Sequence, residues 1–138
     1  MDQTTRRLLR LCYWLGAVTD GLAIIPMVVP PVGVALFVAG GREFHADYRY
    51  AMYLGAALMA GWTVLLVWAD RDPLARRGIL LITVFPVLTG IVAAQLYGVT
   101  GGLLSAGKTA PLFVHQSVVA TLFLYTYVRA CRVARRRP

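Results

Sequence analysis

A single carboxylate lies near the middle of the first long apolar stretch of the chain. The stretch runs from Leu11 to Val29 and is interrupted only by Asp20. In a helix that rises ~1.5 Å per residue, Asp20 lies ~14 Å from the start of this stretch, close to the centre of a bilayer. A carboxylate at that depth costs at least about 2.5 kcal/mol, so we expect Asp20 to face the bundle, to be paired or to be protonated.

Hydroxyl and amide groups are the available partners of Asp20, because no Lys or Arg lies at a matching depth. The candidates are Thr19, Thr63, Thr83, Thr89, Gln116, Ser117 and Thr121. Burial without a cation favours the protonated carboxyl, so a neutral or proton-exchanging Asp20 is expected. A structural hydrogen bond and a role in ligand binding or coupling both stay open.

A second polar group is expected on the outer side of a membrane. Its members come from the segment GREFHADYR and from the start of the last apolar segment: Glu43, His45, Asp47 and His115. Carboxylates and imidazoles are ligands for zinc and other divalent ions. The spacing matches no recognised metal motif, so we favour a solvated loop with ion pairs to Arg42 and Arg49. We predict no cofactor, with a divalent metal as the alternative.

The segment GLLSAGKT, residues 102–109, matches the phosphate-binding pattern G-x-x-x-x-G-K-[ST]. In a nucleotide site the backbone amides of such a loop surround phosphates, and the loop follows a buried strand. Here the segment follows an apolar helix and is closely followed by Pro111. We interpret it as a flexible glycine-rich turn and predict no nucleotide binding.

These residues belong to a chain that is 59% hydrophobic and only 14% charged, unlike a soluble domain. Four apolar segments are each long enough to cross a bilayer as a helix. The sequence predicts an all-α integral membrane protein, a four-transmembrane-helix bundle forming one domain over residues 1–138. Its predicted parts are helices 11–29, 50–69, 79–98 and 111–130, the outer segment 30–49 and the basic tail 131–138.

Arginine and lysine are concentrated on one side of the predicted membrane. Eleven of the fourteen lie before the first helix, between the second and third, or in the last turn of the fourth and the tail that follows it. The positive-inside rule places both termini in the cytoplasm, and the expected location is the inner (plasma) membrane. The net charge of +8 comes from these clusters, which suit anionic lipid headgroups better than nucleic acid. A chain this small is expected to form a homo-oligomer or to join a membrane complex.

Small residues at four-residue spacing predict close packing between the second and third helices. The pairs are Ala51 and Gly55, Ala56 and Ala60, Ala57 and Gly61, and Gly90 and Ala94. Pro86 predicts a kink in the third helix. The apolar segment 30–41 is too short to span, so we expect a bent extension of the first helix, a re-entrant piece or a surface helix.

Four short helices with one acidic residue midway along the first resemble the small multidrug resistance transporters. In that family the carboxylate exchanges protons for cationic drugs. The resemblance implies that Asp20 is the coupling residue and that Tyr13, Trp14 and Trp62 line the site. Family members carry glutamate at this position and show little charge bias, two points at which this chain differs.

A second resemblance covers residues 45–98. Arg49, Tyr53 and Gly55 form an R-x-x-x-Y-x-G pattern, and WADRDP follows at residues 68–73. This arrangement is similar to a group of uncharacterised small four-helix bacterial membrane proteins, which often end the third helix with arginine where this chain has Gln95. The resemblance implies a fold and no activity.

Three functions are consistent with these observations. The leading hypothesis is a small membrane protein that binds a hydrophobic or amphipathic molecule or a lipid within its bundle, or that acts as an accessory subunit. The alternatives are proton-coupled transport through Asp20 and a membrane enzyme that uses the outer group. The candidate ligand-binding or coupling residues are Asp20, Tyr13, Trp14, Trp62, Gln95 and Gln116.

Overall fold

Four long apolar helical stretches make up most of the described chain. The computed structural model describes residues 3–38 and 45–135. The stretches that are long and apolar enough to cross a membrane are α1 (Gln3–Val28), α3 (Ala46–Ala69), the continuous run Gly78–Thr100 and α6 (Ala106–Arg135). The third stretch comprises α4 (Gly78–Ile82), η1 (Thr83–Leu88) and α5 (Thr89–Thr100). The prediction of an all-α chain with four apolar spans is confirmed, and each helical stretch begins before its predicted start.

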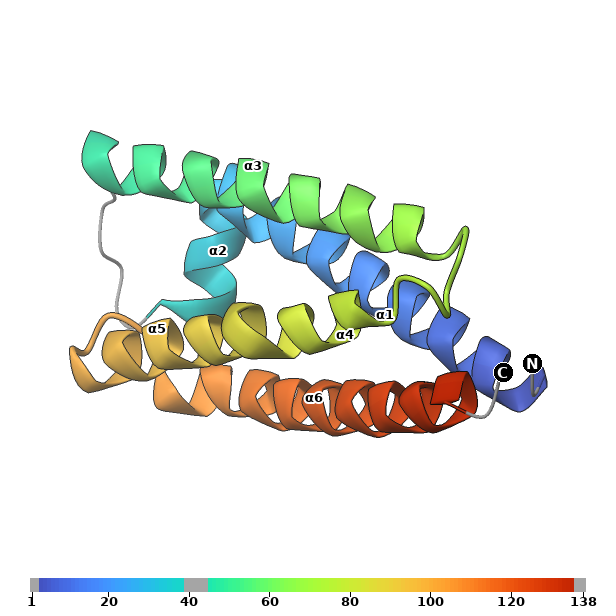
Figure 1. Ribbon diagram of the computed structural model, residues 1–138. Coiled ribbons are helices and arrows are strands. Elements are labelled where there is room, and N and C mark those ends of the chain that lie inside the picture. Colours follow the sequence, from blue (N-terminus) through green and yellow to red (C-terminus); the bar gives the residue numbers. More distant parts are fainter. Residues whose placement is uncertain (1–2, 39–44, 136–138) are drawn as a thin grey trace.

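The long helices form two antiparallel pairs (Figure 1). One pair is α1 with α3, and the other is α6 with the run α4, η1 and α5. Glycines bring the first pair together along its length, where Gly16 lies against Leu66, Gly21 against Thr63, and Gly55 against Met27. Close approach through small residues is the kind of packing by which helices associate where no hydrophobic force drives them together.

The two pairs share a core near one end of the bundle. Its buried side chains are Leu9, Cys12, Tyr13, Ala17, Leu66, Ala69, Leu80, Val84, Val119, Phe123 and Ala130. Both termini lie at this end (Figure 1), and so do the arginines Arg6, Arg10, Arg71, Arg77 and Arg135. We call it the basic end, and the opposite one the far end. Toward the far end the two pairs diverge (Figure 1).

A short helix, α2 (Pro30–Phe37), crosses between the pairs at the far end (Figure 1). The helical conformation is interrupted after α1 at Val29, which has φ −109° and ψ 88°. Pro30 then occupies the first turn of α2, where its missing N–H is not needed. The Ser105 N–H donates to Phe37 O (2.9 Å). The segment is therefore a separate helix that folds back onto the start of α6, and residues 39–41 lie outside the described part.

The predicted close packing of the second and third spans through small residues is wrong. α3 packs along α1 and makes few direct contacts with the run Gly78–Thr100. A methyl group added to Gly61 or Gly90 would meet nothing within 4 Å, so neither glycine supports a close helix contact. Small-residue spacing shows that a helix can be approached closely, but it does not identify the helix that approaches.

The predicted kink at Pro86 is confirmed. Phe85 has the extended angles φ −121° and ψ 110°, as expected for a residue that precedes proline, and the Phe85–Pro86 peptide bond is cis. The Thr89 hydroxyl donates to Pro86 O (3.1 Å) as the helix resumes. The kink separates α4, which joins the core through Leu80, from α5, which continues to the far end.

Gly33 permits the sharp turn between α1 and α2. A Cβ atom at this position would stand 2.6 Å from the backbone oxygen of Pro26, which cannot move aside as a side chain could. We expect Gly33→Ala to lower the free energy of unfolding by about 1–3 kcal/mol, measured by reversible unfolding in detergent. The matched control is Gly61→Ala, which adds the same methyl group where space is open. Equal stability of the two variants would contradict the close approach.

Candidate functional site

Asp20 lies on α1 with one carboxylate oxygen fully buried. Its Oδ2 atom has no hydrogen-bond partner among the described residues. The hydroxyls predicted as partners donate to backbone oxygens of their own helices instead; these hydroxyls are Thr19, Thr63, Thr83, Thr89, Ser117 and Thr121. A Ser or Thr hydroxyl in a helix can donate to the carbonyl three or four residues earlier, which has a second lone pair, and so finds an acceptor without reaching another helix.

Three more interior polar atoms lack a partner in the described part of the chain. They are Gln95 Oε1 on α5, and His115 Nε2 and Gln116 Oε1 on α6. Buried polar atoms are almost always hydrogen-bonded, and one left bare costs about 1–3 kcal/mol. Four such atoms among the described residues mark places where a hydrogen-bonding ligand would lower the free energy.

Asp20 and Gln116 lie near the same depth on facing helices. A Cβ on Gly16 of α1 would stand 3.2 Å from the Phe123 ring of α6, which sets the register between the two helices. Asp20 is one turn further toward the far end, and Gln116 is two turns further. With a pitch of ~5.4 Å, their depths differ by about one turn. Both residues lie where the shared core ends.

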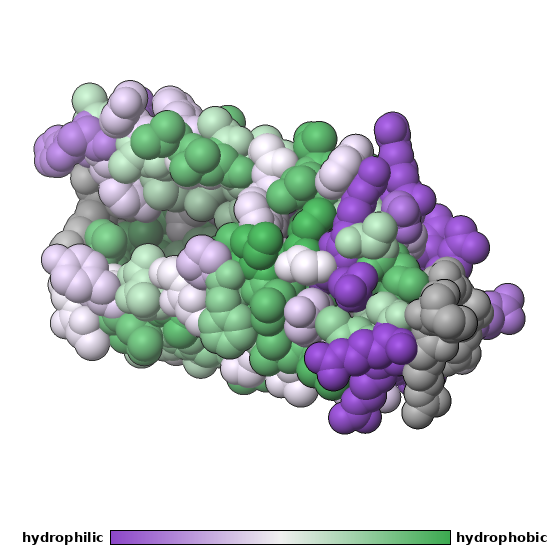
Figure 2. Space-filling view, in the orientation of Figure 1, coloured by the Kyte–Doolittle hydropathy of each residue, from purple (hydrophilic) through white to green (hydrophobic). Residues whose placement is uncertain are grey.

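The surface is hollowed between the two pairs toward the far end (Figure 2). Hydrophobic side chains are visible on the walls of this hollow, while hydrophilic ones gather mainly at the basic end, with a smaller group at the start of α3 (Figure 2). Apolar walls with a small number of polar groups are the usual composition of a site for a small organic ligand.

The aromatic candidates lie at two different depths. Tyr13 is fully buried at the basic end, where its hydroxyl donates to Pro73 O (3.2 Å). Trp14 is half exposed and donates to Asp70 Oδ2 (3.3 Å). Trp62 adjoins Thr63, at the depth of Asp20, and donates to Thr83 Oγ1 (3.3 Å). Of the three predicted lining residues, only Trp62 lies at the depth of the candidate site.

The predicted metal group does not assemble from its described members. Among residues 3–38 and 45–135, no three His, Cys, Asp or Glu side chains gather to hold a metal ion. His45 and Asp47 lie at the start of α3, whereas His115 is nine residues inside α6, a separation of ~14 Å in depth. Glu43 and Arg42 lie outside the described residues.

The glycine-rich segment 102–109 begins as a turn and continues into α6. Gly102 has φ 69°, which glycine adopts without strain. Lys108 Nζ donates to Ala35 O of α2 (3.0 Å), and the Thr109 hydroxyl donates to Ser105 O (2.9 Å). The lysine and the hydroxyl that a phosphate loop would offer to a nucleotide therefore bind backbone oxygens.

No relative supplies an identity. Comparison with models of protein families, with curated proteins and with solved structures finds no significant match to this chain. The likeness to small multidrug resistance transporters and the likeness to uncharacterised four-helix proteins therefore stay expectations from the sequence. The function has to be argued from the residues themselves.

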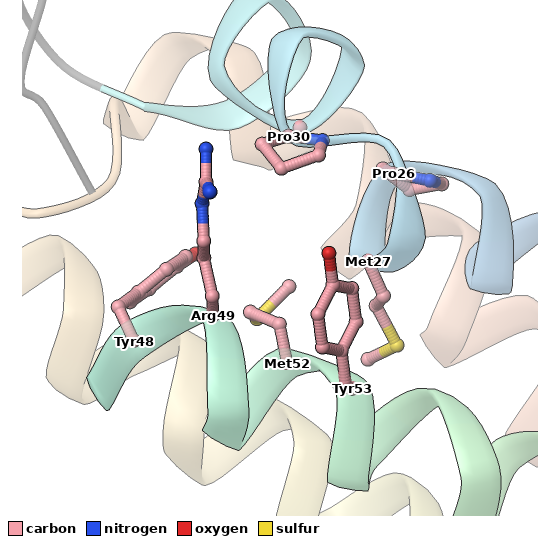
Figure 3. A pocket seen from close by; sticks show the side chains of 8 residues that line it. Pro26, Met27, Pro30, Tyr48, Arg49, Met52 and Tyr53 are labelled. Carbon is pink, nitrogen blue, oxygen red and sulfur yellow. The ribbon is translucent and has the colours of Figure 1, made fainter. Parts of the chain in front are cut away.

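A narrow groove lies beside α2 at the far end. Figure 3 shows Arg49, Met52 and Tyr53 rising from α3 toward the turn between α1 and α2, with Met27 facing them. Its free volume is about 10 Å³, which is room for about one water molecule. No pattern in the sequence predicts this groove, because it exists only where the turn between α1 and α2 lies over α3.

An ion pair closes the basic end of the α1–α3 pair. Arg10 Nε and Nη2 donate to the two carboxylate oxygens of Asp70, at 2.8 and 2.9 Å. The Asp70 side chain is only 12% exposed. The hydrogen bond from Arg10 holds the pKa of Asp70 below its ordinary value. Sixty positions separate the two residues, and no pattern in the sequence pairs them.

The lowered pKa of Asp70 predicts a stability that depends on pH. A carboxyl whose pKa is lower in the folded state stabilises the fold above its unfolded value and loses that contribution as the pH falls through its folded value. We expect Asp70→Asn to be less stable than the parent chain at neutral pH, with the difference shrinking below about pH 4. Thermal unfolding in detergent measures this difference.

Asp72→Asn is the matched control, because Asp72 lies in the same loop and makes no ion pair with a described residue. A difference between parent and Asp70→Asn that stays constant down to pH 2 would contradict the role of the ion pair.

Proposed function

We propose that the chain is a multi-pass membrane protein that binds an amphipathic small molecule between its two helix pairs, with Asp20 as the main polar contact. The observation that carries the proposal is the set of four interior polar atoms without a partner in the described chain. A ligand that supplies their hydrogen bonds would remove a cost that the fold alone does not offset.

The unpartnered atoms specify the chemistry of the ligand. Asp20, Gln95 and Gln116 each present an unpartnered oxygen, which accepts hydrogen bonds. The complementary ligand carries hydrogen-bond donors, such as an amine or a hydroxyl, on an apolar body that fits the hollow. An amine has the further advantage of charge, since a cation next to Asp20 compensates a carboxylate that has no Lys or Arg nearby.

The proposed orientation places both termini in the cytoplasm. It is supported by the excess of arginine at the basic end, where both termini lie (Figure 1). Reporter fusions to each terminus, one active only in the cytoplasm and one active only outside it, test this orientation. Cytoplasmic activity at both ends is the expected result, and external activity at either end would refute it.

Binding of a simple amphiphile tests the role of Asp20. The chain purified in a mild non-ionic detergent is titrated with dodecylamine and, separately, with dodecanol, and bound ligand is counted by native mass spectrometry. We expect Asp20→Asn to weaken dodecylamine binding about tenfold, because a hydrogen bond to a charged group contributes about 1.5–3 kcal/mol. Dodecanol binding should fall less, because asparagine keeps an acceptor oxygen.

Asp47→Asn is the control, since Asp47 is an exposed carboxylate in the first turn of α3. Unchanged dodecylamine binding in Asp20→Asn would sink the proposal. Proton release that accompanies dodecylamine binding, and that disappears in Asp20→Asn, would extend the proposal from binding to proton coupling. If Asp20 had only a structural role, the ligand-free Asp20→Asn chain would show a large loss of stability.

A further inference from the structure

A second cavity opens at the basic end, away from the candidate site. Its volume is about 490 Å³, and its walls come from the start of α1, the loop between α3 and α4, and the end of α6. The residues that line it are Arg6, Arg71, Asp72, Pro73, Leu74, Ala75, Arg77 and Ala134. Three arginines face one aspartate, so the cavity carries excess positive charge.

The arginines of this end divide into those held by the fold and those that are not. Arg10 is bound to Asp70. Arg76 donates to Trp68 O and stacks over the Trp68 ring, with 3.3 Å between its guanidinium carbon and the ring centroid. Arg6 and Arg71 make no hydrogen bond or ion pair with a described residue. Their guanidinium donors therefore stay available to a ligand.

The loop that carries Arg71 and Arg77 is held in place by other groups. Arg77 Nη1 donates to Leu74 O (2.8 Å), and Asp72 Oδ1 accepts the Ala75 N–H (3.4 Å). The Tyr13 hydroxyl donates to Pro73 O (3.2 Å). The arginines thus converge on a cavity whose wall is already ordered.

We infer that this cavity binds a phosphate group, the headgroup of an anionic phospholipid or a free phosphate compound. Guanidinium groups bind phosphate oxygens through paired, charge-assisted hydrogen bonds. The basic ends of membrane helices lie at the level of lipid headgroups, where basic pockets between helices recognise anionic lipids. The phosphate group binds at the cavity beside the α3–α4 loop rather than to the diffuse charge of the carboxyl-terminal tail. This binding does not depend on Asp20.

Lipid binding to paired arginine variants tests the inference. The full chain in non-ionic detergent is mixed with phosphatidic acid, phosphatidylglycerol or phosphatidylcholine, and retained lipid is counted by native mass spectrometry. We expect the double variant Arg6→Gln, Arg71→Gln to lose about twenty-five-fold in affinity for the two anionic lipids, since each basic residue near the surface contributes roughly fivefold. Neither side chain makes a hydrogen bond within the described fold, so the variant should fold normally.

The control is Arg132→Gln, Arg135→Gln, which removes the same charge from exposed positions near the end of α6 that do not line the cavity. An equal loss in this control would overturn the inference, because the binding would then follow net charge alone. A thermal shift with inorganic phosphate, lost only in Arg6→Gln, Arg71→Gln, would support the site with a free phosphate compound as its ligand. Binding of neither lipid nor phosphate by the parent chain would also overturn the inference.

Discussion

The ion pair between Arg10 and Asp70 determines how the basic end is built. It ties the last turn of α3 to α1, with both guanidinium bonds at 2.8–2.9 Å. The loop that follows stays against α1 because the Tyr13 hydroxyl donates a hydrogen bond to Pro73 O. That position brings Arg71 beside the start of α1 and forms the basic cavity. Because apolar side chains gain little from meeting each other in lipid, a polar tie of this kind defines which helices become neighbours.

The bonds between elements are distributed unevenly along the bundle. At the basic end, α1 is bound to α3, to the α3–α4 loop and to α6, where the Cys12 thiol donates to Thr126 Oγ1 (3.3 Å). At the far end the bonds between elements involve α2, through Lys108 to Ala35 O and Ser105 to Phe37 O. Between these two levels, polar groups such as Asp20 have no partner in the described chain. The candidate site occupies this intermediate level, where a hydrogen bond from Trp62 to Thr83 Oγ1 (3.3 Å) links the two pairs.

The sequence predicts the spans well and their neighbours poorly. Hydropathy identifies all four spans because lipid demands continuous apolar helices, and the kink at Pro86 follows from a missing backbone donor. The pairing of α1 with α3 depends on contacts sixty positions apart, which no local pattern encodes. Likewise, the sequence predicts the depth of Asp20, but it does not predict that a carboxylate oxygen of Asp20 lacks a hydrogen-bond partner in the described chain. Only the structure shows that hydroxyls such as that of Thr63 donate to backbone oxygens of their own helices.

Hydroxyls that bond within their own helices have a mechanical consequence for the far half of the molecule. Widening the space between the two pairs there breaks no hydrogen bond from Thr19, Thr121 or Ser117, because each bond moves with its helix. Dispersion contacts and the hydrogen bond from Trp62 to Thr83 resist the first part of such a movement, and the dispersion contacts weaken gradually with distance. The bonds of α2 set the upper limit. The affinity would therefore fall gradually as the bound molecule becomes wider up to that limit, and steeply beyond it.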